Sequence, residues 1–336
     1  MFLSFIVPVY NTAPYLRACL NALLDQDLPE TDYEILCIDD GSSDDSPGIL
    51  LEYASKHPNL RVLRQANSGV SAARNNGIDS AAGDYIWFVD SDDLVARNVL
   101  SWLRKTAEQE SCDRIAFNYY EFQDSFTPEE QAAYEAGTLD AKPRYKDANV
   151  VTGILRRQII VEHGLRFQPS SYGEDCLFAF EFLTHVKKQI VSERSLYYYR
   201  IHSHSASTTQ TPEANRKRYE AGRTNVRVLQ AYLEGKRGPI PNRQHCADLF
   251  MSTLWSTIWH ISMMPRKQAK AALGELKREG LFPRKRPKEC TLDRSYMTSR
   301  TSLYGKLFDF LYIHQASRLG YQLVRLMNRL RTLLRR

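Results

Sequence analysis

The sequence predicts an α/β fold in which a mostly parallel sheet is flanked by helices and followed by a mostly α-helical C-terminal region. Three observations support this. Apolar segments rich in β-branched residues alternate with segments of helical periodicity over the first 110 residues. Acidic residues directly follow several of the apolar segments. From residue 212 onward the pattern is typical of helices. We therefore expect one domain over residues 1–210 and a helical region over residues 211–336.

The elements expected in the first domain follow one another as repeated β-α units require. Strands are expected over residues 2–10, 33–39, 60–63, 84–89 and 113–122. Helices are expected over residues 14–25, 44–56, 71–81 and 94–108. Residues 125–148 are polar, contain two prolines and predict an irregular acceptor loop. Beyond them we expect a helix over residues 173–186 and tyrosine-rich strands over residues 189–200.

Charge is distributed unevenly along the chain. The formal net charge is +6, yet residues 1–110 hold 8 Lys/Arg and 17 Asp/Glu, a net of −9. Residues 211–336 hold 26 Lys/Arg and 9 Asp/Glu, a net of +17. The acidic front and the basic back therefore need separate explanations.

The cysteines and the apolar runs exclude several classes of protein. Six cysteines are widely spaced with no CxxC pair, so neither a zinc site nor a disulfide scaffold is indicated, and a reducing cytosol fits best. No signal peptide is recognisable at the N-terminus. Residues 249–264 are uncharged but carry Ser, Thr and His, which favours a buried or interfacial helix over a membrane-inserted one.

Carboxylates cluster at the ends of three predicted strands. Asn11 ends the first strand, the DDGSSD run over residues 39–44 ends the second, and the DSDD run over residues 90–93 ends the strand over residues 84–89. In a parallel sheet these ends meet at one edge, where ligands bind. Hard oxygen ligands favour Mg²⁺ or Mn²⁺, which bridges substrate phosphates. Taken alone, DSDD is equally consistent with a cap of the next helix.

Together the motifs are far more specific. PVYN, then DDGSSD about 30 residues later, then GVSAARNNGIDSAAGDYIWFVDSDD resemble glycosyltransferase family 2 in order and spacing. The resemblance is specific over residues 1–110 and looser to about residue 210. It implies a GT-A fold and an inverting, metal-dependent transfer of a sugar from a nucleotide sugar. A Rossmann dehydrogenase is disfavoured because no GxGxxG follows the first strand.

The resemblance assigns the first two strand ends to the nucleotide. Tyr10 matches the residue that lies against the base, with Pro8 in the same motif, and a core aromatic is the alternative for Tyr10. Asp40 matches the acid that hydrogen-bonds the base, and Asp39 stands beside it. An acid that accepts the N3–H of uracil favours a UDP-sugar, because cytosine has no proton there, and leaves dTDP-sugars open.

The GVSAARN and DSDD motifs match the segments around the diphosphate and the metal. Gly69 and Arg74 border the nucleotide, although Arg74 has the alternative of a structural pair with Asp39 or Asp40.

In DSDD, Asp90 and Ser91 match the donor site, and Asp90 and Asp92 match the metal ligands, with Asp92 the more secure. Asp93 has the alternative of capping the following helix.

The catalytic base of the family matches the GED sequence over residues 173–175. Asp175 would take the proton from the acceptor hydroxyl as its oxygen attacks the anomeric carbon. Glu174 would orient the acceptor or support the loop. Without the resemblance, two carboxylates that open a helix indicate only a favourable interaction with the helix dipole.

The sequence YYYRIHSHS over residues 197–205 resembles the family's segment that reaches the metal and phosphates. His202 matches a position that reaches the metal or diphosphate, with a surface histidine as the alternative. Ser205 matches a position at a phosphate oxygen. A loop that closes over the phosphates would stabilise the leaving group.

Residues 310–336 predict an amphipathic helix with six arginines and no acids. Such a helix is suited to an anionic membrane surface, although packing on the protein with a solvated basic face is the alternative. Nucleic-acid binding is not expected, since no recognition motif accompanies the charge. We expect a cytoplasmic enzyme that is peripheral on the inner face of the cell membrane and acts on a glycan or lipid-linked oligosaccharide. The competing class is a non-catalytic sugar-nucleotide-binding membrane scaffold.

Overall fold

The computed structural model describes residues 1–140, 149–169, 173–202, 211–235 and 243–281. The chain forms two compact units. The first comprises Met1–Ser170 with Glu174–Thr208, and the second Ser171–Gly173 with Thr209–Arg336.

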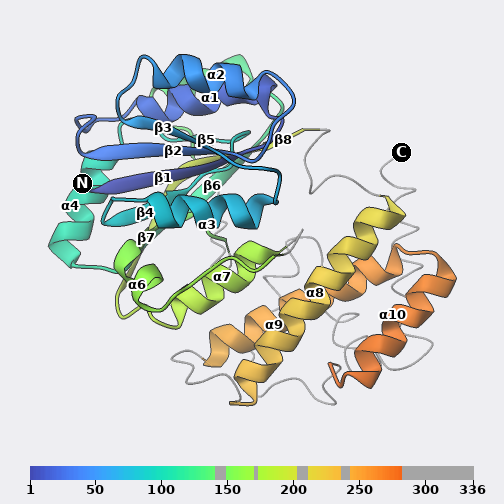
Figure 1. Cartoon of the computed structure of the whole chain (residues 1–336). Helices are drawn as coiled ribbons and strands as arrows, with labels where there is room; N and C mark the ends of the chain where they lie inside the picture. The colour runs from blue at the N-terminus through green and yellow to red at the C-terminus, as the bar shows by residue number, and fades with distance from the viewer. Residues whose placement is uncertain (141–148, 170–172, 203–210, 236–242, 282–336) are drawn as a thin grey trace. The chain divides into compact units, whose positions relative to one another are not determined.

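In its described residues, the first unit contains an eight-stranded sheet, and helices connect many of its strands (Figure 1). Its elements in chain order are β1 (Leu3–Val9), α1 (Ala13–Leu24), β2 (Tyr33–Asp39), α2 (Ser46–Ala54), β3 (Leu60–Arg64), α3 (Val70–Ser80), β4 (Tyr85–Phe88), β5 (Leu94–Val95), α4 (Leu100–Glu110), β6 (Arg114–Gln123), α5 (Pro128–Glu135), β7 (Gly153–Arg156), α6 (Arg157–Glu162), α7 (Glu174–Leu183) and β8 (Gln189–Ile201).

The sheet order β3-β2-β1-β4-β7-β6-β8-β5 brings three predicted strand ends to one edge. Strand β1 pairs in parallel with β2 (Leu3 opposite Tyr33) and with β4 (Leu3 opposite Tyr85), and β3 pairs in parallel with β2. Strand β7 runs antiparallel to its neighbours, whereas β6 and β8 are parallel. Figure 1 shows α1 and α2 on one side of the sheet and α3 on the other. The carboxyl ends of β1, β2 and β4 therefore lie together.

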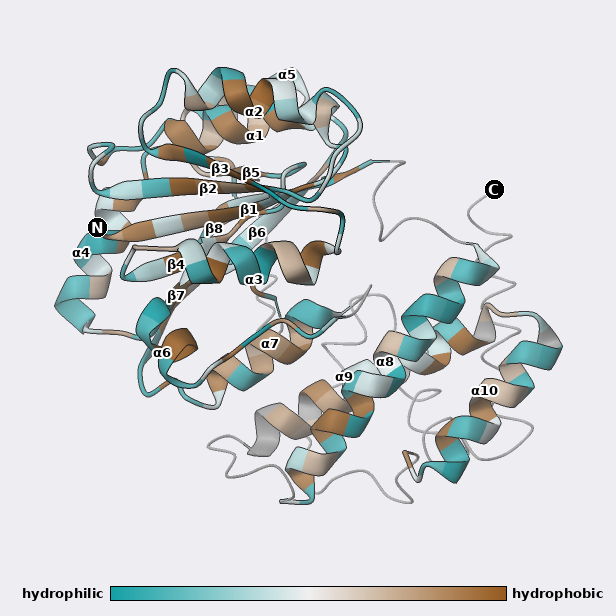
Figure 2. Ribbon diagram, in the orientation of Figure 1, coloured by the Kyte–Doolittle hydropathy of each residue, from teal (hydrophilic) through white to brown (hydrophobic). Residues whose placement is uncertain are grey.

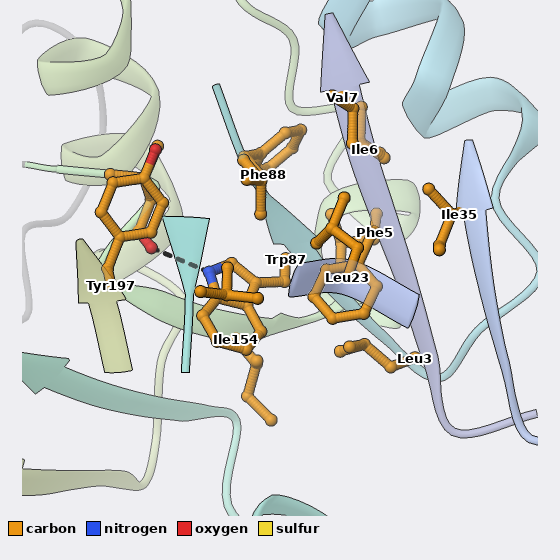
Figure 3. Close-up of a cluster of buried hydrophobic side chains, with 14 of the residues drawn as sticks. Leu3, Phe5, Ile6, Val7, Leu23, Ile35, Trp87, Phe88, Ile154 and Tyr197 are labelled. Atoms are coloured by element: carbon orange, nitrogen blue, oxygen red, sulfur yellow. Dashed lines mark hydrogen bonds between the residues drawn. The ribbon is translucent and has the colours of Figure 1, made fainter. Parts of the chain in front are cut away.

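The central strands form because their side chains are apolar on both faces, as expected for strands covered by helices on both sides. Every residue of β2 and β4 is buried, and Figure 2 shows the apolar colouring along the central strands. Phe5 and Trp87 lie 5.3 Å apart between ring centroids in the core cluster of Figure 3. The Trp87 indole N–H donates to the Val151 carbonyl at 2.9 Å, so this large side chain is buried without an unpaired polar group.

Three segments differ from the expectations. Residues 94–108 do not form one helix: Leu94 and Val95 form β5 against β8, and α4 begins only at Leu100. The expected loop over residues 125–148 contains α5, which starts with a capping box between Thr127 and Glu130. Strand β7 and helix α6, over residues 153–162, were not expected. Residues 141–148 lie outside the described part.

The second unit is built in its described part from three helices, α8 (Pro212–Leu233), α9 (Arg243–Ser262) and α10 (Arg266–Arg278). Helix α8 begins after Thr211, whose hydroxyl accepts from the Ala214 N–H at 3.1 Å. The Tyr219 hydroxyl of α8 donates to the Glu275 carboxylate of α10 at 2.6 Å. The buried apolar side chains of this unit include Val226, Leu229, Phe250, Leu254, Ile258, Ile261 and Leu276.

Most of the uncharged stretch over residues 249–264 lies in α9, and side chains such as Phe250 and Leu254 are buried within the unit. None of the helices in the described ranges is both long enough and apolar enough to span a bilayer. Residues 310–336, for which an amphipathic helix is expected, lie outside the described residues.

Candidate active site

The loop after β1 is tied to the loop after β2, so the first two strand ends form one structure. Asn11 adopts a left-handed conformation, with φ of 53°. Its side-chain oxygen accepts from the Ser43 N–H at 2.8 Å, and its own N–H donates to the Ser42 hydroxyl at 3.1 Å. Tyr10, beside it, is half-exposed, whereas Pro8 is partly buried within β1. The Tyr10 ring is thus available to a ligand and is not a core aromatic.

Asp39 and Asp40 accept hydrogen bonds from the backbone of the loops that follow β2 and β3. Asp39 accepts from the Ser42 N–H at 2.9 Å and lies 3.2 Å from the Arg64 guanidinium. Asp40 is buried, and its two oxygens accept at 2.8 Å from the N–H groups of Ser68 and Gly69. Each carboxylate therefore shapes the edge of the site, and base recognition by Asp40 remains a prediction.

Helix α3 carries a buried cation into the site. It begins after Gly69, whose φ of 87° favours glycine. The Arg74 guanidinium is buried and donates at 2.8 Å to Asp90 and at 2.8 Å to Glu174. Its partners are therefore not Asp39 or Asp40, the alternative left open by the sequence. One side chain thus links the loop after β4 to the start of α7.

The four residues of DSDD face in different directions. The carboxylates of Asp90 and Asp92 remain partly exposed, at 35% and 26% of the side chain. The Ser91 hydroxyl is buried and accepts from the Thr12 hydroxyl at 3.0 Å. Asp93 is buried, and its two oxygens accept from Tyr197 and from the backbone of Arg200. Asp93 caps no helix, because its carboxylate is bound to β8 and α4 begins seven residues later.

Strand β8 brings His202, the residue after its end, to the loop of residues 90–93, which we call the acidic loop. The His202 imidazole Nε2 lies 2.9 Å from Asp92 Oδ2, and its ring lies against the Tyr15 ring, with 4.4 Å between centroids and the planes tilted by 38°. His202 is buried, so it is not the surface histidine that was the alternative. Ser205 lies outside the described residues, and its expected phosphate contact stays a prediction.

The acidic loop carries an excess of negative charge. Burial and the charge of Asp90 raise the pKa of Asp92, which the hydrogen bond to His202 opposes. Burial and the charges of Asp92 and Asp90 also raise the pKa of Asp93. A divalent cation would relieve this repulsion, and two carboxylates with an imidazole are a donor set that suits one. Within the described ranges, no three His, Cys, Asp or Glu side chains already stand in metal-binding geometry.

Helix α7 places Glu174 and Asp175 in its first turn. Glu174 is buried against Arg74, whereas Asp175 is partly buried and accepts the Cys176 N–H at 2.8 Å. Burial, followed by the charge of Glu174, raises the pKa of Asp175 to about 6, and the Arg74 cation opposes this rise. A carboxyl with such a pKa is suited to proton transfer near neutral pH.

Two residues in the site were missed by the sequence reasoning. Tyr197 and Arg200 lie in the YYYRIHSHS segment, from which only His202 and Ser205 were chosen. The Arg200 side chain donates to the Asp92 carbonyl at 2.7 Å, and Tyr197 contacts both ends of DSDD. The YYYRIHSHS motif contains both residues, but the pairing of β8 with β5 decides which of its side chains point toward the loop of residues 90–93.

Comparisons with known proteins agree with these features. The family model described as Glycosyl transferase family 2 matches residues 4–162. The chain is 32% identical over 225 residues to the uncharacterized glycosyltransferase YibD of Escherichia coli, covering 61% of this chain and 63% of YibD. It is 31% identical over 246 residues to the putative glycosyltransferase EpsH of Bacillus subtilis, covering 69% of each. With the minor teichoic acid biosynthesis protein GgaA of B. subtilis it shares 29% identity over 230 residues, or 64% of this chain and 51% of GgaA. The match thus spans less than two thirds of YibD and GgaA.

A solved structure confirms the GT-A fold expected from the resemblance. Residues 1–349 of TarS from S. aureus, in complex with UDP-GlcNAc, superpose with a TM-score of 0.68 at 20% identity, covering 98% of this chain and 92% of that one. The motifs, the family model and the extent of the match to EpsH agree. The chain belongs to glycosyltransferase family 2.

Proposed function

We propose that this protein is an inverting, metal-assisted glycosyltransferase that moves a sugar from a UDP-sugar to a hydroxyl of a glycan or lipid-linked glycan. The observation that carries the proposal is the Arg74 bridge. One buried guanidinium donates at 2.8 Å both to Asp90 in the acidic loop and to Glu174, the neighbour of Asp175. Arg74 thus connects the proposed cation site at Asp90 to the proposed proton acceptor, Asp175. Displacement of a diphosphate from a sugar requires both groups close together.

Asp175 is the general base of the proposed reaction. With a pKa of about 6, its carboxylate is ionised at neutral pH yet basic enough to accept the proton of an attacking hydroxyl. The hydroxyl oxygen attacks the anomeric carbon from the side opposite the diphosphate, so the configuration at that carbon inverts. Arg74 and the α7 backbone hold Glu174 and Asp175 in place during proton transfer.

Asp92, Asp90 and His202 are the residues that would hold a divalent cation. Mn²⁺ or Mg²⁺, when bound, supplies positive charge for the departing diphosphate. The mutual repulsion of the carboxylates supports this assignment. The half-exposed ring of Tyr10 is available to the nucleotide base, and Asp39, Asp40, Gly69 and Ser91 shape the surrounding edge.

Turnover of a panel of UDP-sugars with Mn²⁺, with Mg²⁺ and with chelator tests the proposal. We expect metal-dependent release of UDP from one donor, and its loss in Asp92→Ala and Asp175→Ala. If both variants keep wild-type transfer, these role assignments fail. Tight UDP binding without turnover or metal dependence would instead indicate a scaffold.

We also propose the class of acceptor and the cellular location. The named role of GgaA in minor teichoic acid biosynthesis supports a cell-surface polymer or its lipid-linked precursor as acceptor. The six arginines within residues 310–336 favour attachment to the inner face of the cell membrane. Flotation with anionic liposomes, with and without residues 310–336, tests the attachment, and equal flotation of the two proteins would contradict it.

A further inference from the structure

A buried hydrogen-bonded pair lies behind the acidic loop. The Tyr197 side chain on β8 and the Asp93 side chain are both buried, at 0% and 1% exposure. The Tyr197 hydroxyl donates to Asp93 Oδ2 at 2.6 Å. The same hydroxyl accepts from the Asp90 backbone N–H at 3.2 Å. One hydroxyl therefore joins the first and last residues of the loop over residues 90–93.

Strand β8 fixes the loop at further points. The Arg200 N–H donates to Asp93 Oδ1 at 2.7 Å, and the Arg200 side chain donates to the Asp92 carbonyl at 2.7 Å. Directly after the loop, Val95 in β5 pairs with Tyr197 in the antiparallel ladder. The loop backbone is thus held on the side of β8, which leaves the Asp90 and Asp92 side chains on the open side.

Asp93 differs from its two acidic neighbours in this respect. Both of its oxygens accept hydrogen bonds from β8, and almost none of the residue is exposed. Asp90 and Asp92 keep 35% and 26% of their side chains exposed. The three acids therefore divide into two that a ligand can reach and one that faces the protein.

We infer that Tyr197 and Asp93 are positioning residues that hold Asp90 and Asp92 in the geometry in which they bind a cation together with the donor diphosphate, and that Asp93 is not itself a ligand. The inference rests on the proposed function. Groups that hydrogen-bond behind metal ligands, when removed, typically weaken metal binding by about 10- to 100-fold. Tyr197 acts on the metal-binding side chains through its hydrogen bond to the Asp90 backbone N–H.

Tyr197→Phe is the test, with Tyr198→Phe as its matched control. The substitution keeps the ring and removes only the hydroxyl. Tyr198 is the adjacent residue, is equally buried, and donates its hydroxyl to the Leu139 carbonyl at 3.2 Å, away from the loop. Tyr197→Phe removes two buried hydrogen bonds, to Asp93 and from the Asp90 N–H, and Tyr198→Phe removes one, so thermal unfolding reports the stability that each variant loses. Only Tyr197→Phe alters the acidic loop.

The quantity to measure is the metal enhancement of UDP affinity, the ratio of the UDP dissociation constants without Mn²⁺ and with one fixed Mn²⁺ concentration at which the wild-type enhancement is still rising, obtained by calorimetry on the full chain. We expect Tyr197→Phe to lower this ratio by about 10-fold or more and Tyr198→Phe to leave it at the wild-type value. Asp93→Asn, which keeps only one oxygen where two accept from the Tyr197 hydroxyl and the Arg200 N–H, is expected to lower it in the same way. Because the two residues act as one pair, the double variant is expected to lose little beyond either single variant.

Three results would overturn the inference. An unchanged ratio in Tyr197→Phe would mean that the pair only stabilises the fold. Fully additive losses in the double variant would make Asp93 a ligand. If Tyr197→Phe does not fold, an unchanged ratio in Asp93→Asn overturns the inference by itself. Absence of any metal enhancement in the wild-type protein would be a different failure, that of the proposed function, and the inference would fall with it.

Discussion

Glu174→Gln is expected to move the pH dependence of catalysis while it keeps the site assembled. The glutamine retains an oxygen that accepts from the Arg74 guanidinium, which now donates to Glu174 at 2.8 Å. What disappears is a negative charge beside Asp175. That charge is, after burial, the second largest cause of the raised pKa of Asp175.

The size of the effect follows from the pKa of Asp175, which rises from 3.8 to about 6 in the fold. Each unit corresponds to about 1.4 kcal/mol between the two protonation states. Since burial contributes the most and Glu174 comes next, removing the glutamate charge is expected to lower the pKa of Asp175 by roughly one unit. Asp175, the proposed base, can accept a proton only when it is ionised. The acid limb of the rate profile is therefore expected near pH 6 in the wild type and about one unit lower in the variant.

The assay is metal-dependent UDP-sugar hydrolysis at saturating donor and Mn²⁺, measured between roughly pH 4.5 and 8. The position of the acid limb is read independently of the maximal rate, which the substitution also changes. Glu108→Gln, at an exposed position on α4, removes the same charge elsewhere and is the control. Acid limbs at the same pH in Glu174→Gln and the wild type would refute the reasoning, and so would an equal shift in Glu108→Gln.

Three further predictions concern stability. Asp175→Asn is expected to be more stable than the wild type at pH 7, by up to about 3 kcal/mol, because a carboxyl with a raised folded pKa loses its favourable contribution as the pH rises through about 6. Denaturant unfolding at pH 7 and pH 4 checks this, and a gap that does not close toward pH 4 would contradict it. Arg74→Met leaves the buried Glu174 carboxylate and the partly exposed Asp90 without their cation. It is expected to cost about 3–5 kcal/mol in the same unfolding assay, whereas a loss below about 1 kcal/mol would mean that the ion pairs contribute little. Gly83→Ala would bring a Cβ to 2.5 Å from the Ser4 backbone nitrogen, and we expect about 1–3 kcal/mol of destabilisation seen as a lower Tm. Gly274→Ala in α10 is its control, because there the added Cβ would meet no atom of the described residues within 4 Å outside its own helix backbone and chain neighbours, and we expect it to keep or raise the Tm.

Most of the parallel half of the sheet was predictable because β1, β2 and β4 are largely apolar segments. The segment that forms β2, YEILCID, is buried at every position, and Asp39 and Asp40 mark where the strand stops. Strand β5 was not predictable in this way. It has two residues, Leu94 and Val95, whose pattern is also typical of the start of a helix. They form a strand because they pair antiparallel with β8. Local sequence carries no information about that distant partner.

Which predicted residues lie together at the candidate site followed from the sequence more readily than their pairings did. The motifs identified Arg74, the DSDD acids, Asp175 and His202. The sequence could not predict the partner of Arg74, because several acids were possible and their distances from Arg74 depend on the fold. These acids are Asp39, Asp40, Asp90 and Glu174. Similarly, the three tyrosines over residues 197–199 look alike in sequence, and the pleat of β8 decides which hydroxyl turns to the acidic loop.

The position of β1 between β2 and β4 has a consequence for how the chain is completed during synthesis. Strand β1 is the first to emerge, and its pairing with β2 requires closure of about 30 residues, whereas its pairing with β4 requires about 80. One edge of β1 therefore stays unpaired until residue 88 has been made, which leaves a hydrophobic strand open to wrong partners. Strand β8 follows more than 100 residues later and supplies Tyr197 and Arg200, with His202 directly after its end. The edge that carries the candidate site is thus complete only after β8 has been made, near the end of the first unit.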